Sequence, residues 1–275
     1  MFDHAPVQND HALMQDPAFA RALRLCGQSP LHLSGGLMVL RRHFAGVPVA
    51  MIPRASPPPD LRTQLRAAGL HRTPLILSPD QPADLPFALR LRKPRQIAML
   101  DLHPSPEALR AGLHAKWRNQ LRQAEGTRLK VRCTHLPPDP DTPVLRAEAL
   151  QSGRRNYANW PAPLTAAFAS VAPNQTHMFC ALDQGQTVAT MLFLTHGSTA
   201  TYHIGHITPA GKAHCAHNLL MWEAMQRLRR HGISQLDLGQ LNPNTETIDR
   251  FKLRAGAQAR ATGGTHLYWR PLARG

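Results

Sequence analysis

The spacing of hydrophobic and polar residues predicts short helices and strands in the first hundred residues. Asp16 can cap a helix whose first residue is Pro17, and Gly27 ends that helix. Ala45-Gly46 separates two strand-like segments and therefore predicts a hairpin. Together these signals predict helices at residues 17–26 and 60–68, and strands at residues 37–44, 47–55, 75–77 and 96–102.

The longest helical pattern of the first half lies at residues 105–126. It has a buried stripe that recurs every four residues, formed by Leu109, Leu113, Trp117 and Leu121. The adjacent face is polar and carries Arg110, His114, Arg118 and Arg122. A strand is predicted at residues 129–134, and a Pro- and Asp-rich linker starts at Leu136. We therefore predict two domains, at residues 1–135 and 141–275.

The second half predicts two helices, three strands joined by hairpin turns, and then alternating helices and strands. The helices are expected at residues 143–151, 164–170, 218–231 and 245–254, with a loop at 208–217. The strands are expected at residues 177–182, 187–195, 199–207, 235–239 and 259–269. A three-stranded meander followed by this alternation is typical of an α+β fold.

Composition narrows the class of protein. The 275 residues are 43% hydrophobic, which is enough for a packed core. No apolar run reaches the roughly 18–20 residues of a membrane span, and the first residues lack the pattern of a signal peptide. A cytoplasmic location is therefore expected. The four cysteines lie far apart, which argues against a disulfide framework and a structural zinc site, so no metal is expected.

The charge suggests an anionic partner. The chain has 32 Lys and Arg residues against 17 Asp and Glu residues, which gives a net charge of +15. Nucleic acid, a nucleotide cofactor or an acidic membrane face would suit this charge. Only five of the cationic residues are Lys, so the arginine excess can equally reflect genomic base composition.

Four motifs in the same order resemble the FemAB-like branch of the GNAT acyltransferase superfamily. They are the helical stretches 116–125 and 219–225, the strand end Asp237-Leu238-Gly239, and Phe251-Lys252 with Gly256-Ala257. The resemblance covers residues 105–269, and residues 1–100 match loosely as a first lobe. It implies an α+β fold of two GNAT-like lobes, with mixed central sheets flanked by helices, packed around a cleft.

The resemblance also implies where the reaction takes place. Phe251 and Lys252 match the Phe-Lys pair at the reacting centre of that branch, and the Lys252 ammonium could stabilise the oxyanion or the leaving group. Without the motif, they would be a surface lysine beside a core phenylalanine. Asp237 could orient an amine or Lys252, or simply cap a strand end. Gln240 and Asn242 could line the same cleft.

His203 and His206 lie on the third meander strand. One of them could face the cleft as a general base, although histidines on strands are more often structural.

Donor and acceptor contacts are predicted on three further segments. Gly211, Lys212 and Asn218 could hold a phosphate at a helix N-terminus, with Tyr202 nearby. The loop has one glycine where many GNAT enzymes have a glycine-rich sequence, and an ordinary polar loop is the alternative. Arg118 and Arg122 suit phosphate or carboxylate recognition, or form a solvated face. An anionic acceptor could contact Arg155 and Tyr157, next to Arg154.

These inferences favour an N-acyltransferase that moves an acyl group to an amine of a small molecule or peptide. Acyl-CoA is the expected donor substrate, with no permanently bound cofactor, because 275 residues leave no room for the helical arm of some tRNA-dependent relatives. One alternative is aminoacyl-tRNA-dependent transfer to a cell-wall precursor or peptide, which the charge favours. A catalytically silent module that binds anions or nucleic acid is the other.

Overall fold

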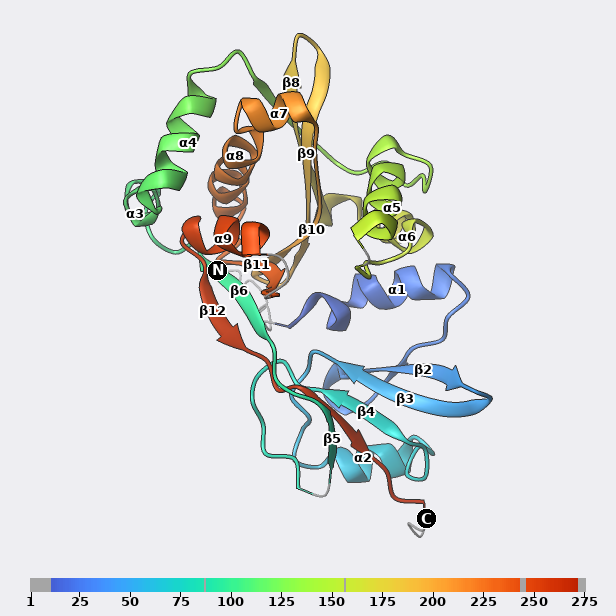
Figure 1. Cartoon of the computed structure of the whole chain (residues 1–275). Coiled ribbons are helices and arrows are strands. Elements are labelled where there is room, and N and C mark those ends of the chain that lie inside the picture. The colour runs from blue at the N-terminus through green and yellow to red at the C-terminus, as the bar shows by residue number, and fades with distance from the viewer. Residues whose placement is uncertain (1–10, 87, 156, 243–245, 272–275) are drawn as a thin grey trace, which may run out of the picture.

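The computed structural model describes residues 11–86, 88–155, 157–242 and 246–271, and it organises them around two mixed sheets (Figure 1). The smaller sheet has six strands. In spatial order they are β1 (Leu31–His32), β2 (Met38–Phe44), β3 (Val47–Pro53), β4 (Leu75–Ser78), β13 (Thr265–Tyr268) and β5 (Leu89–Arg92). Helix α2 (Leu61–Ala67) packs Leu61 and Leu65 into the hydrophobic core of this sheet.

The larger sheet has seven strands. Their spatial order is β12 (Gln258–Ala261), β6 (Gln96–Asp101), β11 (Gln235–Gln240), β10 (Thr199–Ile207), β9 (Gln186–His196), β8 (Thr176–Asp183) and β7 (Lys130–Thr134). The pair β10–β11 is parallel, and the other neighbouring strands of this sheet are antiparallel. The chain crosses between β10 and β11 through the longest helix of the described residues, α8 (Ala216–Arg230).

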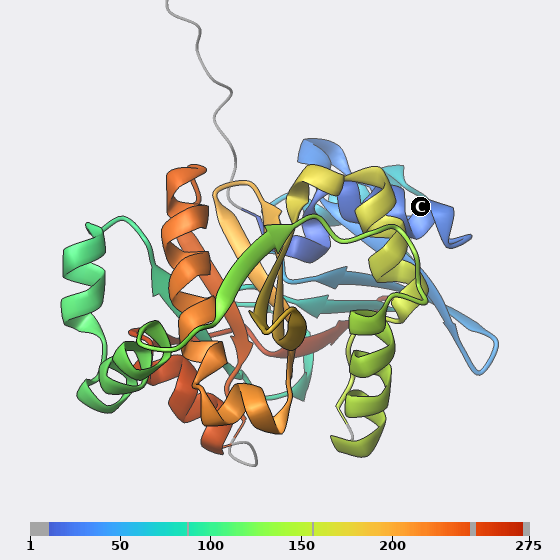
Figure 2. The same ribbon diagram turned by 90° about the horizontal axis from the view of Figure 1, so that it is seen from above.

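Helices cover both faces of the larger sheet (Figure 2). Side chains of β9 alternate between two cores: Met191 and Phe193 face the core shared with α8, and Leu192 and Leu194 face the other core. On the α8 side lie α3 (Pro106–Gly112), α4 (Ala115–Glu125) and α9 (Glu246–Arg254), and on the opposite side lie α5 (Pro143–Arg155) and α6 (Ala162–Val171).

Helix α1 (Pro17–Leu25) ties the two sheets together. Asp16 accepts a hydrogen bond from the Ala18 amide, and Pro17 occupies the first turn, as the sequence predicts. Phe19 packs in one core with Met38 of β2 and Leu194 of β9. The helix therefore lies between α6 and the smaller sheet (Figure 1).

Short helical turns complete the described structure. They are the 3-10 turns Leu13–Gln15, Ser34–Gly36 and Pro173–Gln175, and the helix α7 (Pro209–Ala213). Within the described residues, every helix is too short or too polar to cross a bilayer.

The prediction of one helix at residues 105–126 is wrong, because the chain breaks between α3 and α4. Leu113 has extended backbone angles (φ −63°, ψ 136°), and the His114 amide donates a hydrogen bond to the Arg254 carbonyl oxygen of α9. The His114 side chain then caps α4 by accepting from the Lys116 amide. A contact with a distant part of the chain therefore outweighs a continuous hydrophobic stripe.

The predicted strand at residues 259–269 is also wrong as a single strand. β12 pairs with β6 in the larger sheet, and β13 pairs with β4 and β5 in the smaller sheet. Gly264 separates them with a φ of +81°, a conformation that glycine adopts without strain. The predicted loop at 208–217 contains α7, which the Thr208 side chain caps.

The division of the chain at residues 135 and 141 does not coincide with the division between the sheets. Strands β6 and β7 precede residue 135 but belong to the larger sheet, whereas β13, near the end of the chain, belongs to the smaller one. The two-domain division at that linker stays a prediction.

The central position of β9 generates a stability test. Phe193 is completely buried, whereas Phe44, at the end of β2, is 54% exposed. We expect Phe193→Ala to lower the free energy of unfolding by about 3–5 kcal/mol, and Phe44→Ala to lower it by less than about 1 kcal/mol. Chemical denaturation measures both changes. Equal losses in the two variants would contradict the packing described above.

Candidate active site

The two parallel strands β10 and β11 separate partway along their length. Thr199, Ala200 and Thr201 pair with Gln235, Leu236 and Asp237, and there the pairing ends. From that point β10 continues beside β9, with an irregularity between Tyr202 and Ile204, and β11 continues beside β6. Diverging parallel strands create a place where a ligand can reach the backbone of a sheet, so we take this point as the centre of the site.

Side chains already bind several carbonyl groups of β10 beyond the point of divergence. Asn159 donates to the His203 carbonyl oxygen at 3.0 Å, and Gln151 donates to that of Gly205 at 3.1 Å. The His217 imidazole donates to the His206 carbonyl oxygen at 3.0 Å. These contacts fix the path of β10 from both faces of the sheet.

Asp237 lies at the point of divergence and is buried. One carboxylate oxygen accepts from the Gly239 amide at 2.8 Å, which stabilises the turn made by Gly239 at φ +81°. The other oxygen accepts from the Arg54 guanidinium at 2.7 Å. Arg54 follows β3, so this ion pair connects the two sheets. The Asp237 side chain therefore has a firm structural partner as well as its position at the site.

The ion pair extends into a network that sequence reasoning missed. Arg54 also donates to Asp80 at 2.6 Å, and Arg260 of β12 donates to the second oxygen of Asp80 at 2.7 Å. The pairs Arg54–Asp237 and Arg260–Asp80 join residues 183 and 180 positions apart in the chain, so they leave no local signal in the sequence. The network fixes the ends of β3 and β4 against β11 and β12.

Lys252 is buried beside this network. Its side chain comes from α9, is 7% exposed, and donates to the Gln240 carbonyl oxygen at 2.8 Å. Burial lowers the pKa of Lys252, and the nearby charges of Asp249 and Asp237 oppose part of that effect. The alternative of an ordinary surface lysine is therefore wrong for Lys252. A buried ammonium with a lowered pKa can both donate a hydrogen bond and transfer its proton.

Residues around Lys252 position it. Phe251 packs its ring 5.9 Å from that of Trp117 in α4 and 6.4 Å from that of His217 in α8. The Gln240 side chain accepts from Arg95 at 2.8 Å. The backbone amide of Asn242 donates to the Asp249 carboxylate at 2.6 Å. Gln240 contacts Lys252 through its carbonyl oxygen, and Arg95 is a neighbour that the sequence did not suggest. The roles of Phe251, Gln240 and Asn242 in a cleft stay predictions.

The two histidines of β10 differ in their surroundings. The His203 ring bonds with the Thr165 hydroxyl at 3.0 Å and lies 4.9 Å from the Trp160 ring. Burial lowers the pKa of His203 to about 4, so the neutral ring fits a structural role against α6. The His206 side chain is half-buried. Its role as a general base stays a prediction.

The sequence analysis did not select two further histidines, the half-buried His217 and the buried His196. Burial is the main cause that lowers the pKa of each to about 4. His217 bonds to the backbone of His206. His196 donates to the His11 carbonyl oxygen at 2.7 Å and bonds with the Thr201 hydroxyl at 2.8 Å. Both rings brace the strands that form the site.

The predicted phosphate-binding loop folds as α7. The Gly211 amide donates to the Thr208 hydroxyl, and a Cβ atom at Gly211 would lie 2.4 Å from the Val188 carbonyl oxygen. Close packing on β9 therefore explains this glycine. Lys212 is exposed. Asn218 is buried, and the nitrogen of its side-chain amide has no hydrogen-bond partner among the described residues. The Asn218 side chain can therefore donate a hydrogen bond to a ligand.

Tyr202 packs closely over Gly205. A Cβ atom on Gly205 would collide with the Tyr202 hydroxyl, so only glycine fits there. The Tyr202 ring also lies 5.5 Å from the Phe193 ring. Contact with a donor stays a prediction for this residue, as it does for Gly211 and Lys212.

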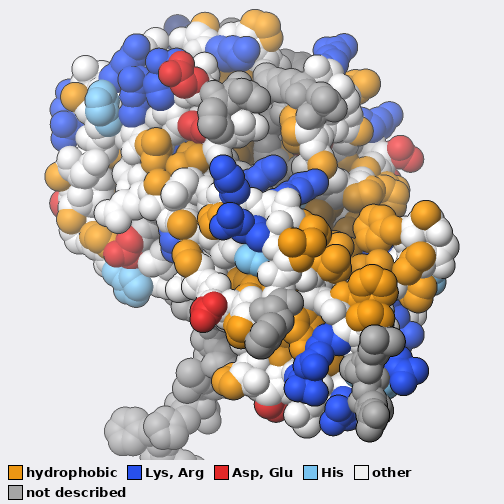
Figure 3. Space-filling model, turned by 60° about the horizontal axis from the view of Figure 1, so that its bottom comes forward, with side chains coloured by type: hydrophobic (Ala, Val, Ile, Leu, Met, Phe, Trp, Pro, Cys, Tyr) orange, Lys and Arg blue, Asp and Glu red, His pale blue; other side chains and the backbone are white. Residues whose placement is uncertain are grey.

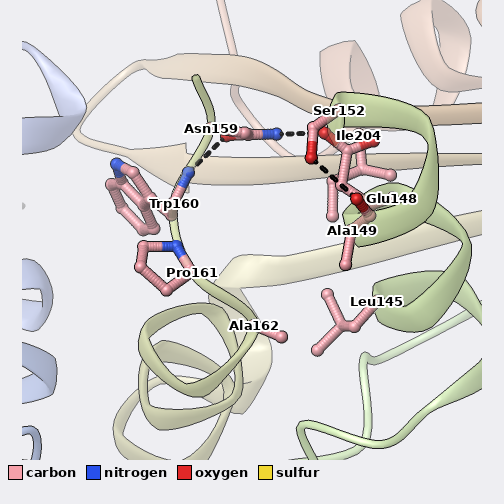
Figure 4. Close-up of a pocket in the computed structure, with 9 residues that line it drawn as sticks. All are labelled: Leu145, Glu148, Ala149, Ser152, Asn159, Trp160, Pro161, Ala162 and Ile204. Atoms are coloured by element: carbon pink, nitrogen blue, oxygen red, sulfur yellow. Dashed lines mark hydrogen bonds between the residues drawn. The ribbon is translucent and has the colours of Figure 1, made fainter. Parts of the chain in front are cut away.

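A cavity of about 160 Å³ lies on the α5 side of β10 (Figure 4). Glu148 and Ser152 of α5, Trp160, and Ile204 of β10 line it. Glu148 is 6% exposed. Its carboxylate accepts hydrogen bonds from the Tyr157 hydroxyl and from the side-chain amide of Asn159, each at 2.8 Å. The predicted contact residue Tyr157 thus holds a buried carboxylate. Arg155 ends α5, and its side chain lies outside the described residues.

The pair Arg118 and Arg122 lies on α4, where a hydrogen bond from Arg110 and, to a smaller extent, the charge of Arg122 lower the pKa of the Glu125 carboxyl. Arg118 donates to the Ala111 carbonyl oxygen at 3.4 Å, and Arg122 donates to the Asn119 side chain at 3.3 Å. Lys116, Arg128, Lys130 and Arg132 are exposed on the same helix and on the segment that follows it. Separately, Figure 3 shows Lys and Arg side chains gathered on one face of the molecule, beside a hollow. Anionic ligands would be attracted to such surfaces.

The chain belongs to the family described as the acetyltransferase (GNAT) domain, whose model matches residues 110–252, more than half of the chain. The match spans both helices α4 and α8 and ends at Lys252. The prediction of an acyltransferase of the GNAT superfamily is therefore confirmed.

Solved structures extend the likeness to nearly the whole chain. FemX superposes with a TM-score of 0.74 at 13% identity, covering 96% of this chain and 94% of FemX. A conserved protein of unknown function from Bacteroides thetaiotaomicron gives a TM-score of 0.65 at 12% identity, with coverage of 94% and 92%. L-PGS from Bacillus licheniformis gives 0.56 at 11% identity, with coverage of 97% and 90%. At these identities the likeness shows the fold, and it confirms the predicted α+β fold of two GNAT-like lobes. A comparison with curated protein sequences finds no match.

The Arg54–Asp237 ion pair generates a second stability test. Asp237→Asn leaves the Arg54 guanidinium without one of its two carboxylates in a largely buried position, so we expect a loss of about 3 kcal/mol in the free energy of unfolding. The matched control is Glu125→Gln, which breaks the more exposed pair with Arg110 and should cost less than about 1 kcal/mol. Chemical denaturation of both variants provides the comparison, and a smaller loss in Asp237→Asn than in the control would contradict it.

The lowered pKa of Lys252 has a consequence for stability. Between the folded-state pKa and the ordinary value of 10.5, the unfolded chain binds more protons at this lysine than the folded chain does. This lysine therefore makes the folded state more stable as pH rises through that window. We expect the wild type to gain stability relative to Lys252→Met between about pH 7.5 and about pH 10. Urea denaturation at the two pH values measures the difference, and a constant difference would contradict the assignment.

Proposed function

We propose that this acyltransferase moves an acyl group from acyl-CoA to a primary amine of a small molecule or peptide, with the reaction centred on Lys252. The observation that carries the proposal is the buried Lys252 ammonium, which lies near Asp237 where β10 and β11 diverge. Burial of an ammonium group costs free energy unless an opposite charge compensates it. The oxyanion that develops during acyl transfer would be such a charge. A cytoplasmic location stays a prediction from the sequence.

The reaction needs a polarised donor carbonyl and a deprotonated amine. In the proposed step the amine nitrogen forms a bond to the thioester carbon, and the carbon–sulfur bond then breaks. Lys252 donates a hydrogen bond to the carbonyl oxygen as it becomes negative. Its lowered pKa also suits proton transfer to the departing thiolate. The proton released by the amine is assigned to His206, the half-buried histidine of β10.

The donor is proposed to enter at the N-terminal end of α8. Asn218 offers a buried amide group with an unused hydrogen-bond donor, counted among the described residues, and Lys212 offers an exposed charge nearby in the chain. Gly211 supports this site indirectly by letting α7 pack on β9. Phosphate groups bind at helix N-termini with such neighbours, which supports a CoA donor.

The acceptor is proposed to use the cavity beside Glu148. This carboxylate is buried, and it accepts hydrogen bonds from two neutral donors, Tyr157 and Asn159. A buried negative charge of this kind suits the ammonium form of an incoming amine. Asn159 also donates a hydrogen bond to the His203 carbonyl oxygen, so acceptor binding would act directly on β10.

Aminoacyl-tRNA is the second candidate donor, and the exposed basic residues favour it. Lys116, Arg122, Arg128, Lys130 and Arg132 lie on α4 and on the segment through β7. A row of this kind would suit a phosphate backbone. The basic row also suits the third alternative, a module that binds anions or nucleic acid. The GNAT family match favours catalysis over that alternative.

Donor binding and Lys252 variants test the proposal together. We expect acetyl-CoA or longer acyl-CoAs to bind saturably, and to lose little affinity between low and physiological salt. A tRNA complex that releases several counterions would weaken steeply over the same range. Lys252→Ala should lower kcat by about 100-fold or more with little change in KM for the donor, whereas the control Lys93→Ala, at an exposed lysine outside the basic row, should retain activity.

The outcomes separate the three candidates. Salt-resistant acyl-CoA binding with loss of turnover in Lys252→Ala supports the proposed reaction. Salt-sensitive binding that depends on the aminoacyl group of tRNA would instead support aminoacyl-tRNA as the donor. Binding of tRNA or other anions that is unchanged in Lys252→Ala, with no turnover of any acyl donor, would leave only the third.

A further inference from the structure

A second cavity, of about 310 Å³, lies at the C-terminal end of α8, at the opposite end of that helix from α7. Three histidines and one arginine line it: His135 follows β7, His177 belongs to β8, and Arg227 and His231 belong to the end of α8. Thr134 and Asn174 add a hydroxyl and an amide to the lining. Among the described residues, no carboxylate lines this cavity.

The three imidazoles are arranged around His177. Its ring centroid lies 6.1 Å from that of His135 and 6.2 Å from that of His231. His135 donates through Nδ1 to the Thr176 carbonyl oxygen at 3.0 Å, and His231 donates through Nδ1 to the Arg227 carbonyl oxygen at 2.7 Å. A carbonyl oxygen only accepts, so these bonds fix the proton on Nδ1 and leave Nε2 of both rings for another partner.

The charges around His177 all have the same sign. Its pKa is lowered to about 4, mainly by burial and also because His135, His231 and Arg227 repel a positive ring. Cys133, the remaining neighbour from β7, is itself buried enough that its pKa is raised, so it supplies no negative charge at neutral pH. A negative ligand would convert this repulsion into attraction.

The composition of the cavity distinguishes between ligand classes. Within the described part of the chain, no group of three or more His, Cys, Asp or Glu side chains has the arrangement that holds a metal ion. An anion fits better, because protonated imidazoles, a guanidinium, a hydroxyl and an amide are all hydrogen-bond donors. A tetrahedral oxyanion with two negative charges could accept from several of them at once.

We propose that this cavity binds a doubly charged oxyanion of the phosphate and sulfate class, held by Arg227 and by the imidazolium forms of His177, His135 and His231. The site is separate from the acyl-transfer site and does not depend on the proposed function. Because the ligand favours protonated histidines, binding takes up protons, and the affinity rises as the pH falls.

Sulfate is the first probe, since it keeps both negative charges over the whole range of the experiment. The imidazole signals of isotope-labelled protein are followed by NMR during titration with sodium sulfate, with sodium chloride at equal ionic strength as the reference. We expect saturable shifts of the His177 signals, and an affinity that rises by about tenfold or more between about pH 7.5 and about pH 5.5. Inorganic phosphate should compete with sulfate.

Two variants with matched controls test the residues. Arg227→Gln and His177→Gln should each weaken sulfate binding by about tenfold or more. The controls are Arg250→Gln, whose side chain pairs with Glu246 on α9, and His103→Gln, whose exposed ring pairs with Asp101; both should bind sulfate like the wild type. Arg227 is exposed, so its variant should fold even if His177→Gln does not.

Three results would overturn the proposal. They are shifts equal to those that chloride produces, an affinity that does not change with pH, and unchanged binding in Arg227→Gln. The same titrations with acyl-CoA absent and present keep this result distinct from the acyl-transfer proposal, because sulfate binding is expected in both cases.

Discussion

The buried ion pair between Arg54 and Asp237 is the constraint on which the rest of the site depends. Arg54 leaves the smaller sheet and Asp237 lies in the larger one, so the pair sets the position of one sheet against the other. Charges removed from water are stable only with a partner in good geometry. Asp80 and Arg260 add a second such pair, and both sheets contribute to it. The point where β10 and β11 separate is therefore fixed by charge as well as by packing.

Lys252 lies near this network, but within the described part of the chain no carboxylate is bound directly to it. Its nitrogen donates to a backbone carbonyl, whereas Asp237 is occupied by Arg54 and by the Gly239 amide. The arrangement keeps Asp237 close enough to influence the lysine and prevents it from neutralising the lysine. Burial lowers the pKa of Lys252, and the nearby negative charges raise it by less. The site therefore retains an ammonium whose proton is held less firmly than in water.

Local patterns predicted most elements of this fold because capping residues, turns and periodicity are local. The helix break at Leu113 was missed because it depends on a bond from His114 to Arg254, far away in the chain. Similarity of motif located Lys252, Phe251 and Asp237. It could not locate Arg54, Arg95 or Glu148, whose partners come together only in the folded chain. Glu148 is the one acidic residue of α5 and stands between two alanines, which was the available signal.

The pairing of β13 with β4 has a consequence for the order in which the protein can fold. Tyr268, near the end of the chain, pairs with Leu75, and the neighbouring strand β5 joins the sheet only through β13. The smaller sheet therefore cannot close until residues 265–268 have left the ribosome. Until then β4 has an open edge, of the kind that pairs with other chains. A chain whose synthesis stops before Thr265 would leave β4 and β5 without the strand that pairs with both of them.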